Sequence, residues 1–319
     1  MKNNKLNNII NKAKLFFSLD EKKYFKILSI DGGGVRGIFP LHIIKKIKED
    51  FAVTFSKEFD IIAGTSIGSI IAASLALDRE IQEILDIFQD EADEVFQKKH
   101  FELKGLFRSL YDTKALKKVL KNRFNNKTLA DVKTKLLIPA SDISKGRYVI
   151  FGSDSHDTDK YNSLKIYKAV LASCSLPIYF DPVNIGHDLF VDGGLWANNS
   201  MLVALIQALK VGVNLEDIKI LSIGTGKRSI DCKLDQDKKW GALRWNLKLL
   251  GIVSGLQSSS IEDITEFLIK DNLLRINFDF DTDIRMDDVE RMDDLEVIAN
   301  EKYKENFEKI KDFFDIISP

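Results

Sequence analysis

The chain has 319 residues, 45% of them hydrophobic, and its formal net charge at pH 7 is -1. This length allows one large α/β domain or two smaller ones, and the hydrophobic content is enough for a sizeable core. The nearly neutral charge argues against a general affinity for nucleic-acid polymers.

Cysteine usage and hydropathy point to a protein of the cytoplasm. Cys174 and Cys232 are too few and too unpatterned for a disulfide framework or a zinc site, which favours a reducing setting. No apolar run is long enough to cross a bilayer, and the first 25 residues lack the apolar stretch of a secretory signal.

Residues 1–24 are expected to form an amphipathic helical segment ahead of the main domain. Apolar residues recur there at helical spacing and lysines occupy the other faces, which suits a helix on an anionic lipid surface. The pattern also fits a helix packed on its own domain or on a second subunit, and this interpretation is favoured. The apolar positions are Leu6, Ile9, Ile10, Ala13 and Phe17, and the basic ones are Lys2, Lys5, Lys12 and Lys14.

The next segment predicts a strand that runs into a glycine-rich loop. Phe25 to Ile30 are followed by Asp31-Gly32-Gly33-Gly34-Val35-Arg36-Gly37 and by a helix expected from Ile38 to about Glu49. Glycines leave backbone N–H groups unobstructed, so the amides of Gly33 and Gly34 are candidates to stabilise an oxyanion. Arg36 is a candidate ligand for a phosphate group.

The run Gly64-Thr65-Ser66-Ile67-Gly68 predicts a nucleophile. It lies between an expected buried strand, Phe59 to Ala63, and an apolar helix that extends to Leu77. A sharp strand-to-helix turn leaves no room for side chains beside the serine, which accounts for the glycines. The N-terminus of the helix also favours negative charge on the Ser66 oxygen.

A third motif places an acid at the end of a strand. Leu189 to Val191 predict a strand that ends in Asp192-Gly193-Gly194. The glycines allow the carboxylate to lie at a turn near other strand ends. Alone, such a sequence is more often a simple turn. It gains weight from the two motifs that precede it.

These three motifs, in this order, resemble those of the patatin-like phospholipases. Ala172 to Pro177, Trp196 to Asn199 and Leu221 to Gly226 are also similar to the family, so the resemblance covers residues 25 to about 230. Ser200 stands where the family often has proline, a departure that touches no reacting group.

The resemblance implies a three-layer α/β/α domain over residues 25–319, with a mostly parallel central sheet and the reacting groups at the carboxyl ends of its strands. It implies a hydrolase that cleaves fatty-acyl esters of membrane phospholipids and needs no metal or other cofactor. Ser66 is then the nucleophile, Asp192 the general base, and Gly33 and Gly34 the oxyanion hole. Arg36 matches the family's basic residue and is expected at the head-group phosphate. The remaining motif glycines are Gly32, Gly37, Gly64, Gly68, Gly193 and Gly194.

The glycine-rich loop also matches the spacing of a dinucleotide-binding loop, from Gly32 to Gly37. That fold needs an acid at the end of its second strand, where this chain has Ala63 to Ser66. The dinucleotide interpretation is therefore rejected.

Residues 279–290 partly match the spacing of a calcium-binding loop. Asp279, Asp281, Asp283 and Glu290 have the right spacing, but Ile284 occupies the position of the sharp-turn glycine. A solvated loop is the favoured interpretation, and no metal site is expected.

A Ser-His-acid triad is the alternative to the dyad. After Ser66 the histidines are His100, His156 and His187, and none follows Asp192 as the chain order of an α/β-hydrolase triad requires. His42, in the helix after the glycine-rich loop, and His100 are interpreted as ordinary helix residues. The dyad is the favoured arrangement.

The biological role is left open between two enzymes and a binding protein. Asp192 to Asn199 is similar to the corresponding stretch of bacterial patatin-like effectors of anti-phage systems, some of which are activated by cyclic nucleotides. A free-standing lipase of lipid turnover is an equal expectation, and a non-catalytic lipid-binding module is the alternative. Either enzyme would contact the membrane surface transiently. The region Trp240 to Lys270 is expected to be a packed core helix, with a cover over the acyl channel as the alternative.

Overall fold

The computed structural model describes residues 24–96, 109–152, 161–228, 242–280 and 284–316. Residues 1–23, which hold most of the expected N-terminal helix, lie outside these ranges. The same is true of Cys232, His100, His156, Asp281 and Asp283.

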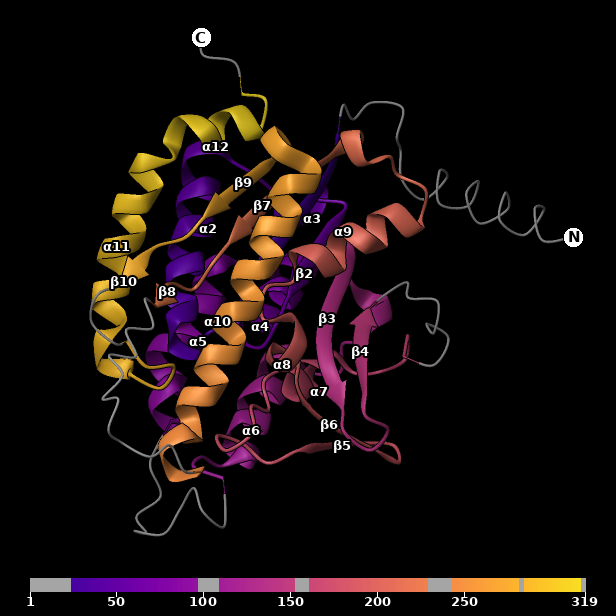
Figure 1. Ribbon diagram of the computed structural model, residues 1–319, viewed down its shortest axis with the longest axis vertical. Coiled ribbons are helices and arrows are strands. Elements are labelled where there is room, and N and C mark those ends of the chain that lie inside the picture. The colour runs from indigo at the N-terminus through magenta and orange to yellow at the C-terminus, as the bar shows by residue number, and fades with distance from the viewer. Residues whose placement is uncertain (1–23, 97–108, 153–160, 229–241, 281–283, 317–319) are drawn as a thin grey trace, which may run out of the picture.

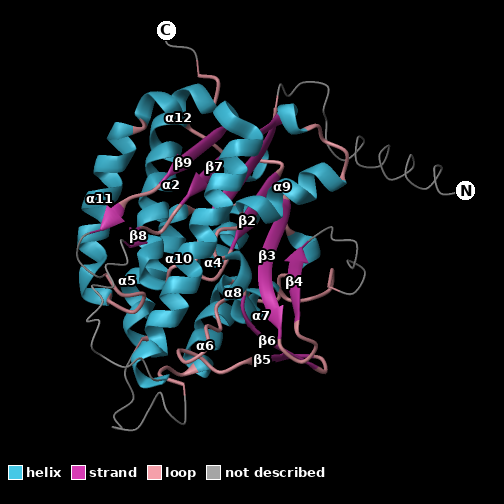
Figure 2. Cartoon of the chain, viewed as in Figure 1, coloured by secondary structure: helices cyan, strands magenta, loops and turns pink. Residues whose placement is uncertain are grey.

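An eight-stranded mixed sheet forms the centre of the described chain (Figures 1 and 2). Its strands follow the order β5-β6-β3-β2-β1-β7-β9, and β4 pairs with β3. The pairs among β9, β7, β1, β2 and β3 are parallel, whereas β4 and β6 are antiparallel to β3 and β5 is antiparallel to β6. The bounds are β1 Phe25–Ile30, β2 Ile61–Gly64, β3 Lys135–Asp142, β4 Arg147–Gly152, β5 Val183–Ile185, β6 Asp188–Asp192, β7 Ile218–Ile223 and β9 Leu273–Ile276, with β8 Lys227–Arg228 and β10 Asp279–Phe280 as a separate pair.

Helices cover both faces of this sheet, which confirms the expected three-layer fold. In β1, Leu28 and Ile30 belong to one core and Phe25 and Ile27 to the other. Because both faces of the central strands are buried, their sequences are continuous apolar runs. The helices are α2 Ile38–Phe51, α3 Phe55–Glu58, α4 Ile67–Ala76, α5 Ile81–Val95, α6 Thr113–Phe124, α7 Ile166–Ser173, α8 Gly194–Ala197, α9 Met201–Lys210, α10 Ala242–Ile269, α11 Met292–Glu305 and α12 Phe307–Phe313.

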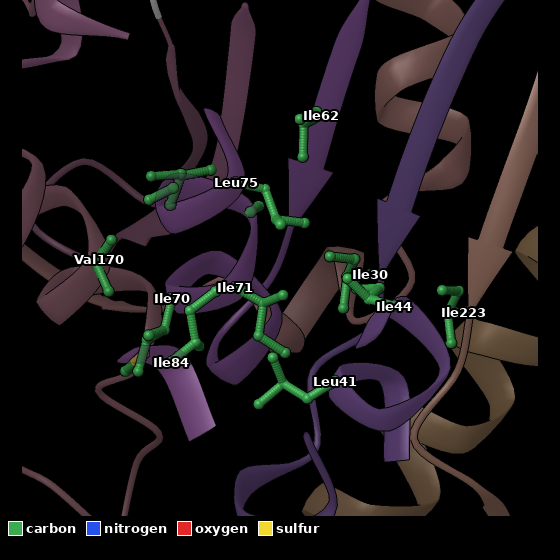
Figure 3. Close-up of a cluster of buried hydrophobic side chains, with 14 of the residues drawn as sticks. Ile30, Leu41, Ile44, Ile62, Ile70, Ile71, Leu75, Ile84, Val170 and Ile223 are labelled. Carbon is green, nitrogen blue, oxygen red and sulfur yellow. The ribbon is translucent and has the colours of Figure 1, made fainter. Parts of the chain in front are cut away.

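The larger core lies between the sheet and the helices around α2 and α4. Figure 3 shows Ile30 and Ile62 from the strands facing Leu41 of α2 and Ile71 of α4. These side chains are fully buried. The core therefore fixes α4, whose first turn follows Ser66, against the ends of β1 and β2.

The sheet register explains how an antiparallel strand brings Asp192 to the edge where the parallel strands end. Ala63 near the end of β2 pairs with Leu137, but β3 continues beyond that point to Asp142. Strand β6 runs back along this overhang, and Asp192 pairs with Ala140. Asp192 thus lies three residues past the Ala63–Leu137 pair, at the level that Ser66 reaches along its own chain.

One strand boundary differs from the prediction. Strand β2 begins at Ile61 and not at Phe59, because Phe59 directly follows the short helix α3. The Phe59 ring stacks on Phe55 and Phe313 in the aromatic part of the core.

Helix α10 corrects the expectation of a packed core helix over residues 240–270. One face packs on the segments that follow β1 and β6, where the Ser254 hydroxyl donates to the Gly194 carbonyl and the Ser258 hydroxyl to Asp31. The other side is solvent-exposed, with Leu256 65% and Phe267 79% accessible. None of its described side chains lines the cavity beside Ser66, so a cover over that cavity is not supported either. The helix forms the outermost layer and has the sheet on one side only.

Gly68→Ala should destabilise the fold. A Cβ at this position would lie 2.4 Å from the Ile30 carbonyl oxygen and 2.7 Å from that of Asp31. These backbone atoms are held in the sheet edge, so we expect the free energy of unfolding to fall by about 1–3 kcal/mol. Urea unfolding measures the change.

Gly251→Ala is the matched control for this substitution. No atom lies within 4 Å of a Cβ at Gly251, which is in the exposed part of α10. The alanine should raise the free energy of unfolding by about 0.5–1 kcal/mol through helix propensity. Equal stability of the two variants would contradict the steric argument.

Candidate active site

Ser66 occupies a strained turn between β2 and α4. Its backbone has φ 54° and ψ -123°, a conformation that non-glycine residues rarely adopt. A Cβ at Gly64 would lie 2.1 Å from the Gly68 carbonyl oxygen, so the turn closes only with glycine there. The sequence-based argument for the two flanking glycines is confirmed.

Ser173 supports this turn, a role that the sequence did not reveal. The Ser66 N–H donates to the Ser173 hydroxyl at 3.0 Å, and that hydroxyl donates to the Pro139 carbonyl at 2.7 Å. The Ser69 hydroxyl donates to the Ser66 carbonyl at 2.6 Å. These bonds tie the turn to β3 and to α4. The stretch Ala172 to Pro177 gave only a similarity to the family, because a serine that bonds to backbone has no spacing signature.

Asp192 is buried beside Ser66. The residue is 1% exposed, and its carboxylate accepts a hydrogen bond from the Gly194 N–H at 2.6 Å. Burial raises the pKa of Asp192 to about 7, and the Gly194 N–H and the nearby Ser66 side chain only partly oppose this effect. The structure therefore brings together a serine and a carboxylate that lie 126 positions apart in the sequence.

The glycine-rich loop lies next to Ser66. Gly34 adopts φ +60°, which favours glycine, and the Gly32 carbonyl accepts the Thr225 hydroxyl at 2.6 Å. Among the described residues, none accepts a hydrogen bond from the N–H of Gly33 or Gly34. The sequence predicts these two N–H groups as donors that stabilise an oxyanion.

Arg36 holds this loop from behind. Its side chain is buried, its Nε donates to the Gly33 carbonyl at 3.2 Å, and its guanidinium lies 5.5 Å from the centre of the Phe280 ring. These contacts stabilise the loop. The expected contact with a head-group phosphate is not part of this arrangement and stays a prediction.

Asp31, the first residue of the loop motif, forms a buried ion pair that the sequence did not reveal. It is 2% exposed and accepts both terminal nitrogens of Arg275 in β9, at 3.0 and 2.6 Å. Arg275 also contacts Glu262 of α10 at 3.3 Å. Burial raises the pKa of Asp31, and Arg275 opposes this shift. Loss of either partner would leave an uncompensated buried charge at the base of the loop.

An apolar cavity of about 80 Å³ opens beside Ser66. Its walls include Ile70 of α4, Phe88 of α5, Val119 of α6 and Phe180 after α7. Cys174 also lines it, and burial raises the pKa of its thiol well above the ordinary value. Cys174 is thus a neutral wall residue. The apolar lining is of the kind that suits a hydrocarbon chain.

The described histidines lie away from this cavity. His42 is on α2 with Nδ1 3.6 Å from Glu296, and burial lowers its pKa. His187 lies exposed in the turn between β5 and β6. Neither lines the cavity with Ser66. Among the described residues, the Asp192 carboxylate and no histidine lies beside Ser66.

Within the described ranges, no group of three or more His, Cys, Asp or Glu side chains is placed to hold a metal ion. Among the helices that the structure describes, none has both the length and the apolar content needed to cross a membrane.

Comparison with known proteins gives consistent matches. A sequence model of the family described as patatin-like phospholipase matches residues 28–205. A cGAMP-activated phospholipase of Pseudomonas aeruginosa is 25% identical over 287 residues, which cover 88% of this chain and 86% of the relative. A cGAMP-activated phospholipase of Escherichia coli is 30% identical over 69% of this chain and 68% of its own length. A cUMP-AMP-activated phospholipase of Escherichia coli is 27% identical over 90% and 93%. The chain belongs to the patatin-like phospholipase family.

Proposed function

We propose that this chain hydrolyses fatty-acyl esters of membrane phospholipids with Ser66 as nucleophile and Asp192 as general base. The observation that carries the proposal is the buried Asp192 carboxylate beside Ser66, a serine that lines an apolar cavity. A general base works best with a pKa near the working pH, and the pKa of Asp192 is about 7.

The proposed reaction has two stages. In the first, the Asp192 carboxylate takes the Ser66 proton as Oγ attacks the ester carbonyl, and the N–H groups of Gly33 and Gly34 donate to the oxyanion. The proton then passes to the departing alkoxide, which leaves as lysophospholipid. In the second stage, water attacks the acyl-serine, Asp192 takes a proton from that water, and the fatty acid leaves as the proton returns to the Ser66 oxygen.

We further propose that a cyclic nucleotide activates the enzyme. The cavity volume of about 80 Å³ is far below the roughly 300–1,000 Å³ of ordinary ligand pockets. Its walls must therefore separate before an acyl chain enters. Three relatives are named for activation by cGAMP or cUMP-AMP. An activator that favours the open walls would couple such a signal to hydrolysis.

This regulation fits an anti-phage effector that acts from the cytoplasm on the membrane surface. The basic amphipathic sequence of residues 1–24 is our candidate for contact with that surface or with a second subunit.

Ser66→Ala should abolish both labelling by a fluorophosphonate and release of fatty acid. The variant lacks the hydroxyl that attacks the ester or the phosphorus centre. Mass spectrometry of products from phospholipid and neutral-lipid panels measures the release. Ser259→Ala, at an exposed position of α10, should keep wild-type activity. Undiminished hydrolysis by Ser66→Ala would contradict the assignment, and lipid binding without any hydrolysis by the wild type would favour a binding module.

A cyclic dinucleotide from a panel that includes cGAMP and cUMP-AMP should raise fatty-acid release by the wild type at least tenfold. The same compound should raise the melting temperature, because it binds the folded chain. A wild type that is fully active alone and does not respond to the panel would favour a free-standing lipase.

The pH dependence should report Asp192. Only the carboxylate accepts the serine proton, so kcat/KM should rise about tenfold per pH unit at low pH and level off above a midpoint near 7. Asp192→Asn retains the shape but not the basicity, and should lower turnover by about 10²–10⁴-fold.

His187→Ala is the control for the dyad and should retain wild-type turnover, and His156→Ala tests the remaining candidate for a triad. An inactive histidine variant together with an active Asp192→Asn would establish a triad. Circular dichroism and melting confirm that each variant is folded.

A further inference from the structure

The segment that follows β10 lies against the glycine-rich loop. Ile284 is 2% exposed and anchors this segment in the larger core. Met286 lines the cavity together with Gly34 and Ser66. Residues 284–287, here called the strap, thus reach the active site from a part of the chain more than 200 positions after Ser66.

The strap fixes the orientation of the Gly34 amide. The Val35 N–H donates to the Met286 carbonyl at 2.9 Å. Only two rotatable backbone bonds, those of Gly34, separate the Val35 N–H from the Gly34 N–H. A Cβ at Gly34 would lie 2.1 Å from the same Met286 oxygen, so the strap approaches as closely as glycine permits. The Val35 N–H is thus occupied by the strap, whereas the Gly34 N–H has no acceptor among the described residues.

Asp287 fixes the Met286 carbonyl. Its side chain is 3% exposed, and its carboxylate accepts the Tyr111 hydroxyl at 2.5 Å and two Arg285 nitrogens at 3.0 and 2.8 Å. Hydrogen bonds to a charged group are stronger than neutral ones. Because Asp287 follows Met286 directly, these bonds limit rotation of the peptide that carries the Met286 carbonyl.

Tyr111 connects the strap to the opposite wall of the cavity. Its N–H donates to the Tyr179 carbonyl at 2.9 Å, and its ring packs against Phe96, Tyr179 and Phe180. Those three aromatic residues line the apolar cavity. The wall that would contact an acyl chain is therefore joined through Tyr111, Asp287 and Met286 to the glycine-rich loop.

We propose that Asp287 is a positioning residue for the hydrolysis, which holds the Met286 carbonyl, and through it the Gly34 N–H, in the orientation that stabilises the oxyanion. The Tyr111 hydroxyl is its anchor. The inference rests on the proposed function, because it assumes that the Gly34 amide acts at the acyl carbonyl attacked by Ser66. It adds two residues that do not touch the reacting atoms.

The test uses Asp287→Asn and Tyr111→Phe in the full chain, with a soluble p-nitrophenyl acyl ester as substrate. Each variant should lower kcat about tenfold or more and change KM less than about twofold, because the oxyanion contact forms in the transition state. The rate of fluorophosphonate labelling should fall in parallel, since the phosphoryl oxygen takes the place of the oxyanion. The kcat of the double variant should be no lower than that of the less active single variant, because both substitutions remove the same hydrogen bond between Tyr111 and Asp287.

Asp288→Asn is the matched control. Asp288 carries the neighbouring carboxylate, and among the described residues its side chain has no hydrogen-bond or ionic partner. It should retain wild-type kcat, KM and labelling rate.

Three results would overturn the proposal. A lower melting temperature with wild-type kcat, measured well below that temperature, would make Asp287 merely structural. A higher kcat would make the strap an inhibitory cover. Equal losses in Asp288→Asn would show no specific role for Asp287. Failure of the wild type to label at Ser66 would instead refute the proposed function, so the two failures are distinguishable.

Discussion

The burial of the Asp192 carboxylate next to Ser66 is the interaction on which the rest of the site depends. Removal of a carboxylate from water is unfavourable, and the Gly194 N–H and the nearby Ser66 side chain offset only part of that cost, so the pKa rises to about 7. The register of the sheet places Asp192 in this buried position. The overhang of β3 carries β6 to the level of Ser66, and the Asp192 N–H is held by the Ser175 carbonyl. A carboxylate with a raised pKa is a stronger base than one in water, and the Ser66 hydroxyl lies beside it.

The glycine-rich loop is held differently, by side-chain and backbone groups from the second half of the chain. Thr225 bonds to the Gly32 carbonyl, Arg275 pairs with Asp31, and the Met286 carbonyl accepts the Val35 N–H. A loop of glycines has little conformational preference of its own. Its shape is therefore set by these contacts, whereas the shape of the Ser66 turn is set by local sterics at Gly64 and Gly68.

This difference explains what the sequence could predict. The strand β1 was predicted from Phe25 to Ile30, its observed bounds, and the Ser66 turn followed from glycine spacing, because both depend on neighbours in the chain. The pairing of Asp192 with Ser66 came from the family resemblance, since strand order is not written in any local pattern. Arg275, Ser173 and Asp287 were missed for the same reason: each acts on a residue more than 100 positions away or through a backbone group. The exposed face of α10 was missed because its apolar residues have the composition of a core helix.

The proposed catalytic residues lie in the matched family region, whereas several residues that hold the glycine-rich loop lie beyond it. Residues 28–205 contain Ser66, Asp192 and the glycine-rich loop. Thr225, Ser258, Arg275 and Met286, which hold that loop or its Asp31, lie beyond this region. Movement of these later segments would alter the glycine-rich loop. Tyr111 and Asp287 join the aromatic wall of the narrow cavity to the same loop. Under the proposed mechanism, this connection would couple the entry of an acyl chain to the backbone N–H groups that stabilise its oxyanion. Under the proposed mechanism, the segments beyond residue 205 that hold the glycine-rich loop are therefore the part of the chain through which an activating signal would reach the reaction.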